Sequence, residues 1–156
     1  MMILTPERMQ AEAAIYSVIQ HLIDSQEALV EVGEKLQNLT LRRFFFVESL
    51  KRAEFRGELD AILNQEGVSD MRDGGTTVGS VRRALAGLKA KLRAGDHTLL
   101  ATAAEAEDEA EEAYIKAMVT SLPLPVREVL TAQAAQIHHS YEYVKSALLR
   151  TRAAAA

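Results

Sequence analysis

The sequence contains no cysteine and no tryptophan, and only 3 of its 156 residues are proline. Without cysteine the chain cannot form disulfides, thiolate-bound zinc sites, iron–sulfur clusters or a thiol nucleophile. No stretch approaches the roughly 20 uncharged apolar residues that a membrane-spanning helix needs. Nearly half of the residues, 48%, are nevertheless apolar, which is enough to bury a core.

The charge balance is mildly acidic, because 18 Lys and Arg face 22 Asp and Glu for a net charge of −4. Such a balance gives no overall attraction to nucleic acid, and we expect none as a partner. The first residues lack the basic segment and apolar run of a signal peptide, so we expect a cytoplasmic protein. The length fits one domain, and we expect residues 1–156 to form a single helical bundle.

Apolar residues recur at intervals of three and four along most of the chain, which indicates amphipathic helices packed as a bundle. Thr5 and Pro6 form a start signal, a capping residue followed by proline at the first helical position. Gly67 and Gly95 interrupt the pattern later. The predicted helices span residues 6–37, 40–65, 78–94, 97–120 and 125–150. No alternating strand pattern competes with them.

The lengths of the connections predict the topology. Short links make the first two long helices an antiparallel hairpin, and the last two another. About 30 residues join the hairpins, enough to travel the length of a bundle. The order predicts an all-α, ferritin-like four-helix bundle whose long crossover contains a short helix. A simple up-down-up-down bundle with a folded-back excursion is the alternative.

Polar residues interrupt the apolar stripe of each long helix near its middle. They are Gln26, Glu48, Lys51, Glu107 and Gln133. If the topology is right, these side chains can form one buried polar layer. A carboxylate in a core is costly unless it is paired, hydrogen-bonded or bound to a metal.

Three explanations of this layer stay open. It could be a metal site, because carboxylate-bridged di-iron bundles place glutamates on facing helices. It could be a structural network in which Lys51 or Arg52 bonds the two glutamates. Alternatively, Glu48 could point outward into solvent. Ligand chemistry favours the network over the metal site, since lysine and glutamine are poor replacements for glutamate and histidine at an iron site.

The short helix predicted at residues 78–94 carries five basic residues and no acidic one. They are Arg82, Arg83, Lys89, Lys91 and Arg93. Such a helix could bind an anionic surface. We favour the simpler explanation that it packs against the acidic helix at 97–120.

Three consecutive phenylalanines, Phe44, Phe45 and Phe46, point to more than one face of their helix. Two of them can be core residues. Phe46 would be exposed unless the crossover or a second subunit covers it. This pattern favours a homo-oligomer, with a dimer as the first expectation.

Several segments together resemble a known family of sequences. They are Leu22 to Glu27, Phe45 to Phe55, Glu107-Asp108 with Ala113-Tyr114, Leu122-Pro123, and Val126-Arg127 through Gln133. Together they resemble a small bacterial ferritin-like family, a four-helix-bundle domain of unknown function distantly akin to rubrerythrin. The resemblance covers about residues 20–150 and rests on pattern and helix order. It implies the bundle with a long crossover and no established activity.

The resemblance also implies where ferritin-type metal ligands would fall. The position on the first helix carries Gln26 in place of glutamate. The Glu-x-x-His positions on the second helix carry Lys51 and Glu54, and those on the fourth carry Gln133 and Gln136. These departures weigh against ferroxidase or peroxidase activity.

One implied ligand survives, because Glu107 matches the glutamate of the third long helix, and Glu48 could contribute a second carboxylate. We predict a Lys51–Glu107 ion pair where the metal would bind. The sequence therefore favours a non-enzymatic interaction or stress-associated protein with a degenerate metal site and no cofactor. The alternatives are a redox bundle that binds iron or manganese through Glu48 and Glu107, with or without a histidine, and a binder of anionic surfaces through the basic helix.

Overall fold

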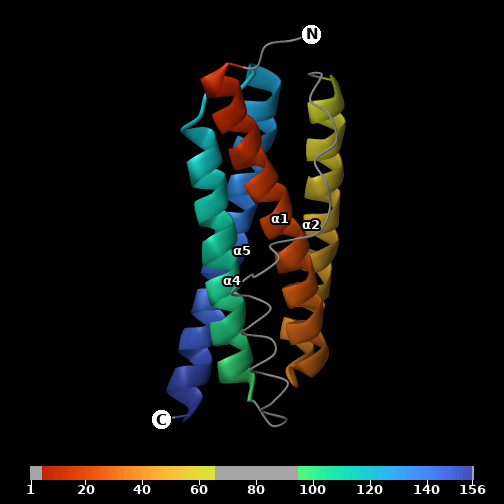
Figure 1. Cartoon of the computed structure of the whole chain (residues 1–156). Helices are drawn as coiled ribbons and strands as arrows, with labels where there is room; N and C mark the ends of the chain where they lie inside the picture. Colours follow the sequence, from red (N-terminus) through yellow and green to blue (C-terminus); the bar gives the residue numbers. More distant parts are fainter. Residues whose placement is uncertain (1–4, 66–94, 156) are drawn as a thin grey trace.

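The computed structural model describes residues 5–65 and 95–155, with side chains up to residue 151. Four long helices pack against one another (Figure 1), and the described residues contain no strand. They are α1 (Pro6–Lys35), α2 (Leu39–Gln65), α4 (Asp96–Met118) and α5 (Leu124–Ala155). The all-α prediction is therefore confirmed. The short basic helix predicted at residues 78–94 lies outside the described residues.

Local signals place most helix ends within two residues of the predicted positions. The Thr5 hydroxyl accepts a hydrogen bond from the backbone N–H of Arg8 at 3.2 Å. The Asn38 side chain does the same for Leu41 at 3.0 Å, at the start of α2. Helix α5 is an exception, since it runs on to Ala155 and not to about residue 150. Its last residues include alanines, which have the highest helix propensity, and no glycine or proline stops them.

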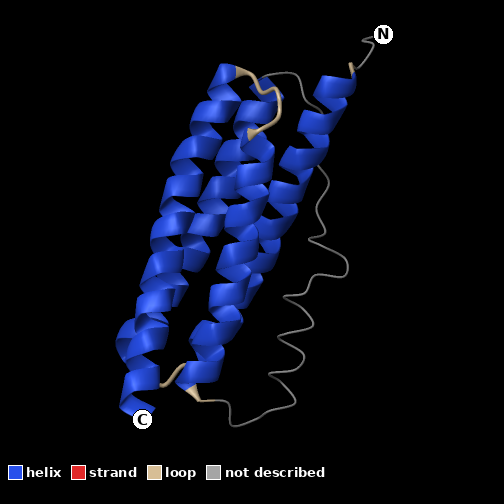
Figure 2. Ribbon diagram, turned by 90° about the vertical axis from the view of Figure 1, so that its left-hand side faces the viewer, coloured by secondary structure: helices blue, strands red, loops and turns tan. Residues whose placement is uncertain are grey.

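Each helix packs against two antiparallel neighbours. Helix α1 lies against α2 and α4, and α5 lies against α4 and α2. The diagonal pairs, α1 with α5 and α2 with α4, run parallel and share no close backbone contact among the described residues (Figure 1). Helix α2 ends at the opposite end of the bundle from the start of α4 (Figure 1 and Figure 2). This arrangement differs from the up-down-up-down alternative.

Hydrogen bonds hold the short turns against the helix ends. At one end of the bundle, Asp96 accepts a hydrogen bond from the backbone N–H of Gln37 at 2.9 Å, which joins the α1–α2 turn to the start of α4. At the other end, Arg127 donates to the carbonyl oxygens of Met118 at 2.7 Å and Thr120 at 2.8 Å. These bonds satisfy carbonyl groups that have no partner inside α4. The start of α4 is thereby bonded to the α1–α2 turn, and its end is bonded to α5.

The buried apolar side chains form two clusters, one toward each end of the bundle. The larger side chains of the cluster near the α1–α2 turn are Leu29, Val32, Leu36, Leu41, Phe45, Leu99, Leu100 and Val144. Those of the cluster near the α4–α5 turn include Ile15, Ile19, Leu22, Phe55, Leu59, Tyr114, Leu130 and Ile137. Each fully buried side chain of this kind contributes about 1.5–3 kcal/mol. Polar residues separate the two clusters at mid-length.

The three consecutive phenylalanines all find places within the chain. Phe45 is fully buried in the core, and Phe44 stacks on Tyr143 of α5 with ring centroids 3.9 Å apart. Phe46 is half-buried against Gly33 of α1, where an added Cβ would lie 3.0 Å from the Phe46 ring. Glycine therefore makes room for the third ring. Helix α1 therefore covers part of the Phe46 ring.

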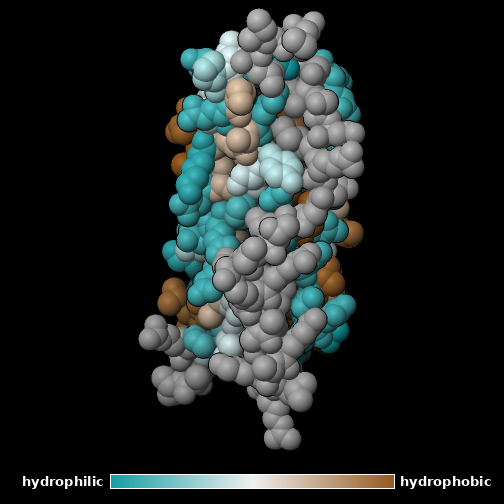
Figure 3. All heavy atoms as spheres, viewed as in Figure 1, coloured by the Kyte–Doolittle hydropathy of each residue, from teal (hydrophilic) through white to brown (hydrophobic). Residues whose placement is uncertain are grey.

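The described surface is mainly hydrophilic on the face shown in Figure 3. Several large apolar side chains are nevertheless exposed, and three of them lie on α2. These are Leu39, Val47 and Leu50, with exposed fractions of 70%, 51% and 66%. None of the described helices is apolar over a length that could cross a membrane.

Candidate functional site

A polar layer crosses the bundle between the two apolar clusters. Its buried members come from all four helices: Asp24 and Ser25 on α1, Glu48, Ser49 and Arg52 on α2, Glu107 on α4, and Gln133 and Ser140 on α5. Each is at most 5% exposed. Polar groups this deeply buried need partners, so their contacts define what the layer can do.

Arg52 lies at the centre of the layer and is 0% exposed. Its Nη2 donates to Glu107 Oε2 at 2.5 Å, and its Nη1 donates to Glu48 Oε2 at 3.5 Å. The guanidinium also lies 5.8 Å from the ring centroid of Phe55. Because α2 and α4 are diagonal helices, the bond to Glu107 joins them directly across the core.

Glu48 connects this buried centre to the surface. Its Oε1 accepts a hydrogen bond from Lys51 Nζ at 3.0 Å, while its other oxygen faces Arg52. The Lys51 side chain is 42% exposed. Glu48 therefore pairs with two cations, Lys51 and Arg52. The buried Arg52 in turn pairs with two carboxylates, those of Glu48 and Glu107.

The predicted Lys51–Glu107 ion pair is wrong, because Arg52 takes that position and Lys51 pairs with Glu48. Consecutive residues on a helix are rotated by about 100°, so Lys51 and Arg52 cannot both point inward. Arg52 continues the spacing of three and four that links Phe45, Glu48 and Phe55. Arg52 is the alternative cation of the network predicted from the sequence, and this spacing favours it over Lys51.

On α1 the structure also differs from the predicted layer. Gln26 is half-buried, whereas Asp24 and Ser25 are 2% and 1% exposed. Ser25 lies three residues after Leu22 and four before Leu29, which is the spacing of the apolar stripe itself. Its hydroxyl donates to the carbonyl oxygen of Leu22 at 3.2 Å and is satisfied within the helix.

Gln133 on α5 is buried and bridges two other helices. Its Nε2 donates to the carbonyl oxygen of Phe55 on α2 at 3.0 Å. Its Oε1 accepts from the hydroxyl of Tyr114 on α4 at 2.7 Å. Burial raises the pKa of the Tyr114 hydroxyl, so the phenol remains a hydrogen-bond donor at neutral pH. Gln133 therefore forms a second link between α2 and α4, toward the α4–α5 turn.

Burial raises the pKa of the Glu107 carboxyl above its usual value of 4.5. The positive charge of Arg52 and the nearby Ser140 hydroxyl oppose this effect, and the charge of Glu48 adds to it. The Ser140 hydroxyl is directed at the Glu107 carboxyl, whose charged form it stabilises. Arg52 Nε has no hydrogen-bond partner among the described residues. Arg52 and Glu107 therefore form a short ion pair, although one N–H of the guanidinium has no partner among those residues.

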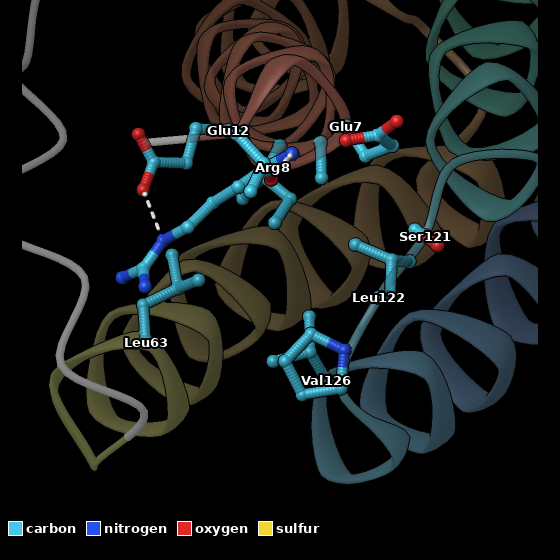
Figure 4. A pocket seen from close by; sticks show the side chains of 11 residues that line it. Glu7, Arg8, Glu12, Leu63, Ser121, Leu122 and Val126 are labelled. Atoms are coloured by element: carbon cyan, nitrogen blue, oxygen red, sulfur yellow. Dashed lines mark hydrogen bonds and ion pairs between the residues drawn. The ribbon is translucent and has the colours of Figure 1, made fainter. Parts of the chain in front are cut away.

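A groove of about 480 Å³ between α2 and α5 opens onto the layer. Glu48 and Ser140 line it beside the more exposed Lys51, Gln136 and His139. A second pocket of about 480 Å³ lies at the end of the bundle near the α4–α5 turn (Figure 4). Leu63, Leu122 and Val126 line this end pocket, and the Arg8–Glu12 ion pair lies at its side. Of the two, the groove reaches the buried charges.

The donor set of the layer does not fit the metal centre that the resemblance implies. The Arg52 guanidinium lies between Glu48 and Glu107, the two carboxylates that a metal ion would need. A permanent positive charge at that place repels a divalent cation. Among the described residues, no group of three or more His, Cys, Asp or Glu side chains is arranged to hold a metal ion.

These features define a class of protein, an all-α bundle of four packed helices with an ionic layer through its core. The chain belongs to the family described as "Domain of unknown function (DUF2383)", whose model matches residues 10–120. The match includes Glu48, Arg52 and Glu107 and ends before α5. The searches of curated proteins and of solved structures found no match.

Replacement of Arg52 by methionine should lower the free energy of unfolding by about 3–5 kcal/mol, because it leaves two buried carboxylates without their shared cation. Urea unfolding followed by circular dichroism measures this loss. Lys51→Met is the matched control, since it removes the exposed cation from the same Glu48 and should cost at most about 1 kcal/mol. The double variant Arg52→Met with Glu107→Leu should recover much of the loss. Equal effects of the two single variants would contradict a central role for Arg52.

The raised pKa of Glu107 predicts a pH-dependent contribution to stability. A folded-state pKa above the unfolded value gives stability that is complete below pH 4.5 and is lost as the pH rises through the folded-state pKa. Glutamine does not titrate. The unfolding free energy of the wild type minus that of Glu107→Gln should therefore fall as the pH rises from 4.5 toward neutrality. Urea unfolding of both proteins across this range tests the sign. A difference that grows with pH would show that the attraction of Arg52 outweighs burial.

Proposed function

We propose that this chain is a non-enzymatic interaction protein of ferritin-like build, in which a structural ionic layer replaces a metal centre. The observation that carries the proposal is the buried guanidinium of Arg52 between Glu48 and Glu107. Arginine is not deprotonated in proteins, so the positive charge that a metal would supply is permanently present. Arg52 and Glu107 are both 0% exposed, which suits a structural pair.

The order of the helices supports the ferritin-like build. Two antiparallel hairpins, α1–α2 and α4–α5, are joined so that α2 and α4 run parallel on one diagonal. A four-helix bundle with one long crossover between its hairpins is the ferritin-like arrangement. In that arrangement Glu107 corresponds to a ligand glutamate, and Arg52 fills the space at the centre of the layer.

Metal analysis tests the replacement of the metal centre. Protein purified without chelator and then supplied with ferrous iron or manganese should contain no stoichiometric metal, because Arg52 already neutralises the carboxylates. Glu107→Ala should give the same result. Elemental analysis showing about one or two metal ions per chain, lost in Glu107→Ala, would restore the redox alternative. Glu111→Ala is the control. Glu111 lies on the same helix as Glu107 but outside the buried layer, with its carboxylate 2.7 Å from a ring nitrogen of the exposed His138.

The interaction role draws on the exposed apolar side chains of α2. Leu39, Val47 and Leu50 fall within about 80° of one another around the helix axis, so they form one face. We define Leu39, Val47 and Leu50 as the α2 face. Apolar side chains grouped in this way favour association. The occupant we propose is a second copy of the chain, in an isologous dimer.

Sedimentation velocity tests the dimer. The wild type should sediment as a dimer at micromolar concentration, and Leu50→Glu should be monomeric because it places a charge in the apolar contact. Val119→Glu is the matched control, since Val119 is 82% exposed but lies at the end of α4. A monomeric wild type, or a Leu50→Glu variant that remains dimeric, would exclude the α2 face as the contact.

A further inference from the structure

A stripe of exposed residues runs along the outer side of α2, opposite the side that the helix buries in the bundle. Successive residues of a helix are rotated by about 100°, so every third or fourth residue returns to one side. The members of this stripe lie within about 100° of one another around the helix axis. All of them are exposed: Thr40, Arg43, Val47, Leu50, Glu54 and Gly57. We call these six residues the outer stripe, which contains Val47 and Leu50 of the α2 face.

The spacing of the outer stripe is the same in both directions along the chain. Its successive members are separated by three, four, three, four and three residues. Alternation of three and four is the spacing by which two helices pack along their length. Because this spacing is symmetric, a second α2 turned end for end matches the first position by position. Val47 then lies opposite Leu50 of the second copy, and Arg43 lies opposite its Glu54.

The charges of the outer stripe distinguish antiparallel from parallel pairing. Arg43 and Glu54 are both exposed, and neither forms an ion pair within the described parts of the chain. In an antiparallel pair of helices, Arg43 of each copy faces Glu54 of the other, so the twofold axis generates two ion pairs. In a parallel pair in register, Arg43 would face Arg43 and Glu54 would face Glu54, and these like charges repel. Charge complementarity therefore favours a second copy in the antiparallel direction.

Gly57, at one end of the outer stripe, is not required by the packing of its own chain. A Cβ added at this position would meet no other atom of the described residues within 4 Å. Glycine nevertheless lowers the stability of a helix interior. Without a side chain, the backbone of another helix can approach closely at this point. In the antiparallel alignment Thr40 of the second copy lies opposite, next to Leu39, which is 70% exposed, so Gly57 leaves room for that leucine.

We propose that α2 packs against α2 of a second copy in the antiparallel direction, with the twofold axis between Val47 and Leu50. The Val47 and Leu50 side chains of both copies form the apolar centre of the contact. An ion pair between Arg43 and Glu54 closes it on either side. This inference rests on the dimer proposed above and adds the direction and the register of its helices, which the apolar residues alone do not determine.

Cross-linking of introduced cysteines tests the direction of the helices. The chain contains no cysteine, so each variant has a single thiol. Full-length Arg43→Cys and Glu54→Cys, mixed in equal amounts and treated with a short bismaleimide, should form a covalent dimer, because their thiols face each other. This mixed dimer still contains one Arg43–Glu54 pair. Either variant alone should not cross-link, since its two thiols lie about 17 Å apart along the helix axes. Val119→Cys at the end of α4 is the control and should cross-link with neither.

Charge reversal tests the ion pairs. Arg43→Glu and Glu54→Arg should each raise the Kd of the dimer about tenfold in sedimentation velocity, because like charges then face each other on both sides of the twofold axis. The double variant Arg43→Glu with Glu54→Arg restores opposite charges and should return the Kd close to that of the wild type. Glu105→Arg is the matched control, since it makes the same change of charge on α4, which shares no close contact with α2 among the described residues. It should leave the Kd unchanged.

The outcomes separate this inference from the dimer on which it rests. If the wild type is a dimer that Leu50→Glu dissociates, but Arg43→Cys cross-links with itself, the antiparallel direction is wrong and the proposed dimer stands. If the double charge variant is as weak as the single variants, the Arg43–Glu54 register is wrong. A monomeric wild type would overturn both the dimer and its arrangement.

Discussion

The bond between Arg52 and Glu107 is the contact on which the arrangement of this bundle depends. It joins α2 and α4, the diagonal helices whose backbones share no close contact. A buried charge pair stabilises little on balance, but a mismatch is costly because an uncompensated charge remains in the core. Sliding one helix by a single turn, about 5.4 Å, would separate the pair. The ionic layer therefore selects one alignment of helices whose apolar stripes alone would allow others.

The same layer divides the core and shapes its chemistry. Apolar clusters lie on both sides of it, and Gln133 adds a second link between the diagonal helices through Phe55 and Tyr114. At the centre, Arg52 supplies a charge that cannot be removed or oxidised. This charge lies between Glu48 and Glu107, the two carboxylates that a metal ion would need.

Glu48 and Ser140 connect the layer to the exterior. Both are buried members of the layer, yet both line the groove between α2 and α5. Glu48 is neutralised by two cations, whereas the hydroxyl of Ser140 is directed at the Glu107 carboxyl. Contact with the buried layer distinguishes the groove from the pocket at the end of the bundle.

The sequence by itself determined the helical elements and most of their limits. Spacing of three and four residues, together with the capping signals at Thr5 and Asn38, depends on local geometry that a helix imposes wherever it lies. The polar interruptions at Glu48 and Glu107 were visible for the same reason. Connection length also indicated parallel diagonal helices, because only a long link can return to the far end of a bundle.

Only the tertiary structure decided which polar side chains meet. Arg52 and not Lys51 reaches Glu107, and Ser25 and not Gln26 is buried on α1. Arg52 and Ser25 follow the spacing of the apolar stripe, but the packing of neighbouring helices determines which partners their side chains meet. The contact between Phe46 and Gly33 likewise joins two helices and is not visible in local spacing. Local spacing specifies a helix and its apolar side, whereas pairing across the core depends on the rotation and separation of helices that meet only in the folded chain.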